Sequence, residues 1–207
     1  MRHKYLLLVA SLGWLSASCT SNDEYLPAPF AVSSRGNLRF KGPERLNSDI
    51  AASLELQPDT VCTELGQYQC TSAVHNVALG GVEPYGTGLY EPSGVTASTT
   101  PLVVERVVWS ACVKRVATDF ADLGSAVIFK GIKLNGAKLA NPNSDEVRGA
   151  VTQLVQRALL REPTETEMAR YVKLATDIEA TGTAEPARSF MQAVCFAVLS
   201  SAEAVFY

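Results

Sequence analysis

Cys62, Cys70 and His75 are the most closely spaced group of chemically versatile side chains in the chain. Thiolate sulfur and imidazole nitrogen are common zinc ligands, and Cys112 would complete a set of four. Zinc sites normally contain tight ligand pairs such as Cys-x-x-Cys, and the sequence has no such pair. We therefore expect His75 to be a structural histidine beside a disulfide, with a zinc site as the alternative.

Any histidine-dependent catalysis would also rest on His75, because His3 lies in a segment that we expect to be removed. A Ser-His-Asp hydrolase normally presents its nucleophile in a Gly-x-Ser-x-Gly turn, which the chain lacks. The Cys-x-x-Cys-His sequence for covalent haem attachment is missing as well. The sequence thus favours a protein without cofactor or enzymatic activity, and an enzyme with a site near His75 is a further alternative.

A stretch rich in Gly, Pro and Tyr, residues 78–94, carries two further binding candidates, Tyr85 and Tyr90. The Gly86–Gly88 segment is no dinucleotide-binding pattern, since no apolar strand precedes it and Glu91 takes the place of the final glycine. We expect an ordered loop with turns. Its tyrosines would either stack on a sugar or peptide or pack onto the helices, and packing is the commoner role.

Four cysteines follow residue 19, an even number that favours two disulfides in an exported chain. Four cysteines allow three pairings, and the sequence alone does not decide among them. We prefer Cys62 with Cys70, which enclose a short polar loop, and Cys112 with Cys195, which each lie in an apolar helical stretch. The alternative for Cys195 is a free, buried cysteine.

The first nineteen residues have the order of a bacterial export signal: two basic residues, the apolar run 5–15, small residues and then Cys19. This order resembles the lipobox of bacterial lipoproteins, although Ser16 stands where leucine is usual. The resemblance implies that residues 1–18 are removed and that Cys19 becomes an acylated N-terminus. Cleavage without lipidation is one alternative, and an uncleaved membrane helix is another, although the run is about half the ~20 apolar residues that span a bilayer.

These segments predict three parts: a signal peptide (1–18), a lipid-anchored flexible tether (19–40) and a single helical domain (41–207). The bilayer would be a partner through the acylated Cys19. Thr20 at the following position, in place of Asp, favours the outer membrane, on its periplasmic face or at the cell surface. Loss of the signal removes two basic groups from a formal net charge of −3, and no Lys/Arg cluster is present, so nucleic acid is not an expected partner.

Three consecutive helices are indicated from Ser144 onward, where apolar residues recur every three or four positions. Asn143 or Ser144 is a suitable N-cap for the first helix. The second begins with a capping box formed by Thr164 and Glu167 and ends at Gly182. The third, residues 184–205, is apolar nearly all round, so we expect it to be the central helix.

Helical periodicity also covers residues 46–56 and the segment that starts at Thr100, where proline follows in the first turn. An Asn-Gly turn within residues 129–139 predicts a small β-hairpin. The expected fold class is mainly α: a C-terminal three-helix unit packed with one or two upstream helices, together with the long Gly/Pro/Tyr loop and the hairpin.

Two motifs stand near the C-terminus. The first consists of Arg161, Pro163, Thr164 and Glu167, and the second of Leu199, Ser200, Ser201, Phe206 and Tyr207. Together they resemble a helical domain of unknown function from large, cytochrome-like multi-domain proteins of planctomycetes and myxobacteria, which has proline where this chain has Ala202. The segment 44–49 shows a weaker similarity to the opening of those proteins. The resemblance implies helical architecture.

The leading functional interpretation is therefore a membrane-anchored, non-enzymatic lipoprotein of the cell envelope that acts by protein interaction. An accessory subunit of an envelope redox or hydrolytic complex is the alternative, and it is suggested by the proteins in which the similar domains occur.

Overall fold

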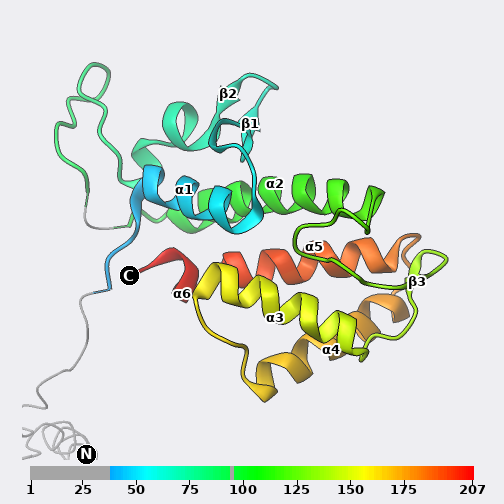
Figure 1. Ribbon diagram of the computed structural model, residues 1–207. Helices are drawn as coiled ribbons and strands as arrows, with labels where there is room; N and C mark the ends of the chain where they lie inside the picture. The colour runs from blue at the N-terminus through cyan, green and yellow to red at the C-terminus, as the bar shows by residue number, and fades with distance from the viewer. Residues whose placement is uncertain (1–37, 94–95) are drawn as a thin grey trace, which may run out of the picture. The chain divides into compact units, whose positions relative to one another are not determined.

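Helix α2 (Thr100–Ala121) and helix α5 (Pro186–Leu199) pack side by side at the centre of the fold (Figure 1). The computed structural model describes residues 38–93 and 96–207. The buried faces of both helices are apolar, and a disulfide between Cys112 and Cys195 joins them. The prediction that the last apolar segment supplies a central helix is confirmed.

The other elements surround this pair. The remaining helices are α1 (Gly42–Leu54), α3 (Asp145–Leu159), α4 (Glu165–Ala180) and α6 (Ala202–Val205). Two antiparallel hairpins are formed by β1 (Thr63–Glu64) with β2 (Tyr68–Gln69), and by β3 (Leu134–Asn135) with β4 (Lys138–Leu139). Single turns of helix are η1 (Pro58–Thr60), η2 (Cys70–Val74, a π-helix) and η3 (Val77–Leu79). The predicted mainly-α class is confirmed.

The predicted caps are present. The Ser144 hydroxyl accepts a hydrogen bond from the backbone N–H of Val147, at the start of α3. Thr164 and Glu167 form both hydrogen bonds of the capping box that begins α4. Gly182 follows α4 with a φ of 74°, a left-handed conformation that glycine adopts without strain.

Two predicted boundaries differ from the structure, and one hairpin was not predicted. The segment 184–205 is two helices, because Ser201 is extended and its hydroxyl caps α6 by accepting the N–H of Ala204. Helix α1 begins at Gly42, four residues before the predicted segment, because Pro43 is well suited to a first helical turn. The hairpin β1–β2 was not expected at all, because its two-residue strands are too short for an alternating pattern.

The folded unit also includes residues that the sequence assigned to the tether. The backbone N–H of Arg39 donates to the carbonyl of Tyr207 at 2.9 Å, and the N–H of Tyr207 donates back to Arg39 at 3.0 Å. Phe40 and Phe206 meet edge to face, with ring centroids 6.0 Å apart. The predicted signal peptide, Cys19 and most of the tether lie outside the described residues. Within the described ranges, every helix is too short or too polar to cross a membrane.

A buried carboxylate fixes the segment that follows α2. Asp119 is fully buried and accepts hydrogen bonds from the backbone N–H groups of Val127, Ile128 and Phe129. Arg115, one turn earlier, donates to the same carboxylate at 2.7 Å. Buried polar groups need partners, and Asp119 supplies an acceptor for the backbone N–H groups of residues 127–129. The chain can therefore bury Phe129, one of the largest fully buried side chains.

Candidate functional site

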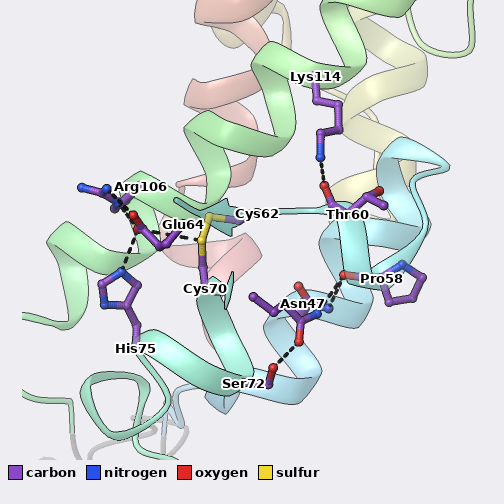
Figure 2. The surroundings of a disulfide bond; sticks show 11 residues. Asn47, Pro58, Thr60, Cys62, Glu64, Cys70, Ser72, His75, Arg106 and Lys114 are labelled. Atoms are coloured by element: carbon purple, nitrogen blue, oxygen red, sulfur yellow. Dashed lines mark hydrogen bonds and ion pairs between the residues drawn. A yellow bond between two sulfur atoms is a disulfide. The ribbon is translucent and has the colours of Figure 1, made fainter. Parts of the chain in front are cut away.

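The disulfide between Cys62 and Cys70 brings the predicted site residues together (Figure 2). It spans the β1–β2 hairpin, with the two Cα atoms 5.4 Å apart, and the N–H of Cys70 donates to the carbonyl of Cys62 at 3.1 Å. Both cysteines are buried. His75 ends the π-helix η2 that begins at Cys70, so the disulfide positions the histidine as well.

The second disulfide joins Cys112 of α2 to Cys195 of α5, whose Cα atoms are 5.7 Å apart. The structure thus contains the two pairs that we preferred, and the alternative of a free Cys195 is wrong. The zinc alternative is wrong too, because Cys62, Cys70 and Cys112 are all oxidised and have no thiolate to offer.

Glu64 lies between two cationic or basic side chains (Figure 2). His75 Nε2 is 3.1 Å from Glu64 Oε1. Arg106, on α2, approaches the carboxylate with both arms of its guanidinium: Nη2 donates to Oε2 at 2.6 Å, and Nε donates to Oε1. The Glu64 side chain is only 17 % exposed, while that of Arg106 is 61 % exposed. The guanidinium therefore lies between the carboxylate and the solvent.

These contacts favour the ionised form of Glu64. The hydrogen bond from Arg106, followed by that from His75, lowers the pKa of the Glu64 carboxyl below its ordinary value. Glu64 in turn raises the pKa of Arg106. Cys70 Sγ lies 3.9 Å from Glu64 Oε1, but a disulfide sulfur has no proton to donate, so this proximity adds no hydrogen bond.

Helix α2 holds the neighbouring turn at a second point. Lys114 lies eight residues, about two helical turns, after Arg106, and its ammonium group donates to the carbonyl of Thr60 (Figure 2). The amides of Asn47 and Gln69 donate to the carbonyl of Pro58 at 3.1 and 3.0 Å. The hairpin is thus fixed to both α1 and α2.

An open groove lies between the hairpin and the outer face of α2. The hairpin contributes Glu64 to its lining, and α2 contributes Arg106, Trp109, Ser110, Val113 and Lys114. Trp109 is 47 % exposed and contacts Phe196 edge to face, with centroids 5.9 Å apart. The groove therefore offers an exposed aromatic ring flanked by two cations, and its hairpin side is held by a disulfide and ion pairs.

The cluster around Glu64 differs from a catalytic triad. Glu64 orients His75 as the acid of a catalytic triad orients its base, but a triad also needs a nucleophile within hydrogen-bonding reach of the imidazole. Among the described residues, no hydroxyl or thiol donates to His75; the nearby Ser72 donates to Gln69 instead. The carboxylate is shared with Arg106, which makes the cluster an ion-pair network that stiffens the hairpin.

Tyr85 and Tyr90 are not part of this cluster. The expected loop is ordered in the described range, but its tyrosines are 99 % and 77 % exposed, so the expectation that they pack onto the helices is wrong. The reason is local: the loop closes on itself through an isolated bridge between Glu83 and Leu89, which leaves both rings pointing into solvent.

The sequence did not identify four charged residues that form ion pairs in the structure. Two of them, Glu64 and Arg106, left no signal, because ion pairs between distant segments leave no local pattern. The pair Arg115 and Asp119 had a detectable signal: charged residues four apart within the apolar stripe of α2.

No protein-family model, curated protein or solved structure matches this chain. The resemblance to the planctomycete and myxobacterial domain stays a prediction. The structure brings its two motifs into contact, because Arg161 of the first donates to Glu203, which lies within the second, at 2.8 Å.

Proposed function

We propose that this protein is an exported, lipid-anchored domain of the cell envelope that acts by binding another protein. The observation that carries the proposal is that all four cysteines after Cys19 are paired in two disulfides. Such pairing is typical of chains that fold in an oxidising compartment, which is where the signal-like N-terminus would deliver this one.

The described surface supports a binding role. Leu102 and Trp109 are exposed on the outer face of α2, and Tyr85 and Tyr90 are exposed on the loop. Tyrosine and tryptophan are enriched in protein interfaces, and exposed apolar side chains that gather on one element favour an interaction site. The bilayer is the second partner of this proposal, through acylated Cys19, on the periplasmic face of the outer membrane or at the cell surface.

The test is fractionation and chemical cross-linking in the native organism. We expect the wild-type protein in the membrane fraction, cross-linked to a specific partner, and we expect Cys19→Ala to remain unprocessed or to leave that fraction. Thr20→Ala serves as the matched control, because it changes the adjacent residue and leaves Cys19 and both disulfides intact. An unchanged distribution of Cys19→Ala would contradict the anchor, and the absence of any cross-linked protein would contradict the binding role.

A further inference from the structure

The loop between η3 and α2 projects away from the helices (Figure 1). Its neck is closed by Asn76, whose side-chain amide donates to the carbonyl of Val82 at 2.6 Å, and by the N–H of Ser93, which donates to the carbonyl of Gly80 at 2.9 Å. A side chain at Gly81 would overlap Asn76, so glycine is required for this close approach.

The tip of the loop is organised by Glu83. Its carboxylate accepts hydrogen bonds from the backbone N–H groups of Gly86 and Thr87, both at 2.6 Å, and its backbone pairs with Leu89. The backbone of the tip, which we call the platform (residues 82–92), is therefore held in place by its own hydrogen bonds. A tyrosine side chain has only two rotatable bonds and so loses little conformational entropy on binding, and the fixed backbone beneath it reduces the cost further.

The platform carries two tyrosine rings and two glutamates, Glu83 and Glu91. Tyr85 and Tyr90 expose their ring faces, and exposed Glu91 forms no ion pair within the described part of the chain. From residue 76 to residue 105 the sequence contains three glutamates and no lysine or arginine. An aromatic ring face attracts cations, and neighbouring carboxylates strengthen that attraction.

We propose that this tyrosine platform, residues 82–92, binds an arginine- or lysine-bearing segment of the protein partner. The inference rests on the proposed function, since it names the kind of partner and the place where it binds. The acidic side chains of the loop favour cations over phosphate groups at its tip, whereas Arg39, Lys41 and Arg45 line the hollow at its base. The guanidinium or ammonium groups would lie over the two rings, with Glu91 beside them.

The experiment is a calorimetric titration of the protein, purified from cells in neutral detergent, with a blocked nonapeptide of alternating arginine and glycine. The control ligands are the same peptide with glutamine in place of arginine and an oligosaccharide of N-acetylglucosamine. The variants are Tyr85→Leu/Tyr90→Leu and Tyr85→Phe/Tyr90→Phe. Tyr68→Leu is the matched control, because Tyr68 is 49 % exposed on the β1–β2 hairpin.

We expect the arginine peptide to bind, and the double leucine variant to weaken binding about fivefold or more, as the loss of two exposed cation–π contacts implies. The double phenylalanine variant retains both ring faces and should bind within about twofold of the wild type, as should Tyr68→Leu.

Each other outcome overturns the inference. Equal binding of the arginine and glutamine peptides, or no binding, would show that the platform does not recognise cations. Tighter binding of the oligosaccharide would make it a sugar site. An equal loss in Tyr68→Leu would mean that the peptide binds exposed aromatic rings without preference for this loop, and no loss in any variant would mean that it binds through net charge alone. None of these results affects the anchoring or cross-linking measured with Cys19→Ala, so the two proposals fail separately.

Discussion

Arg161, in the turn before α4, binds Glu203 of α6 across 42 residues of sequence, with Nε 2.8 Å from Oε1. The same guanidinium donates to both carboxylate oxygens of Glu167, at 2.8 and 2.9 Å. Glu167 is also the capping residue of α4. A single arginine therefore links the start of α4 to the C-terminal helix, and the charge state of Glu167 becomes a determinant of stability.

We predict a loss of stability in acid that depends on Glu167. The hydrogen bonds from Arg161 first, and from the backbone of Thr164 next, lower the pKa of the Glu167 carboxyl from 4.5 to about 2. A lowered folded-state pKa contributes stability that is complete above pH 4.5 and is lost as the pH falls toward 2. Urea unfolding at several pH values should show this decline, with a shallower slope for Glu167→Gln. Identical slopes would contradict the assignment.

Truncation in the core should cost more than removal of a cap. Thr164→Ala deletes the acceptor for the N–H of Glu167 and should lower the free energy of unfolding by about 1 kcal/mol. Leu154 is fully buried in α3, and Leu154→Ala should cost roughly 2–5 kcal/mol through lost burial and a residual cavity. Thermal and urea unfolding check this order, and a less stable Thr164 variant would contradict the packing described for α3.

The two disulfides should differ in their contribution to stability. The chain-entropy relation gives about 4.5 kcal/mol for the Cys112–Cys195 bond, which joins residues 83 apart, and about 2.5 kcal/mol for Cys62–Cys70, which joins residues 8 apart. Paired alanine variants of each bond, compared by urea unfolding, should follow that order. Alkylation of the unreduced protein should detect no free thiol at these four positions, and labelling of Cys195 would contradict the pairing.

Loss of the buried carboxylate should be severe. Asp119→Ala would leave Arg115 buried without its charge partner and three backbone N–H groups without an acceptor, at a cost of roughly 3–5 kcal/mol. The double variant Arg115→Leu/Asp119→Asn removes the buried charge and keeps an acceptor, so we expect it to be more stable than Asp119→Ala. The reverse order in thermal unfolding would show that the ion pair does not govern this segment.

The sequence predicted those features that depend on local pattern. Apolar periodicity and capping residues such as Ser144 and Thr164 identified the helices, because these signals act within a turn or two. The break at Ser201 was missed, since the apolar pattern continues across it and only a cap reveals it. The hairpin between Cys62 and Cys70 was missed because the disulfide and distant side chains, rather than strand propensity, hold it in place.

The candidate site was predictable only in part. The proximity of Cys62, Cys70 and His75 follows from their short separation in sequence. The role of Glu64, which lies between them, was not predictable. Its ion-pair partner Arg106 is 42 residues away in sequence, and such pairs depend on tertiary packing. Aromatic residues more often pack onto neighbouring helices, which favoured the wrong alternative for Tyr85 and Tyr90. In the structure, hydrogen bonds to Glu83 close the loop on itself and keep it away from the helices.

The proposed function requires an exported chain, anchored at Cys19, that presents this disulfide-bonded domain. The most direct measurement is the intact mass of the protein purified from membranes, with fragmentation of its N-terminal peptide. We expect a polypeptide that begins at residue 19 and carries more than one acyl chain on Cys19, because a single acyl chain gives only marginal membrane attachment. A chain that retains Met1, or that begins elsewhere without acylation, would contradict it.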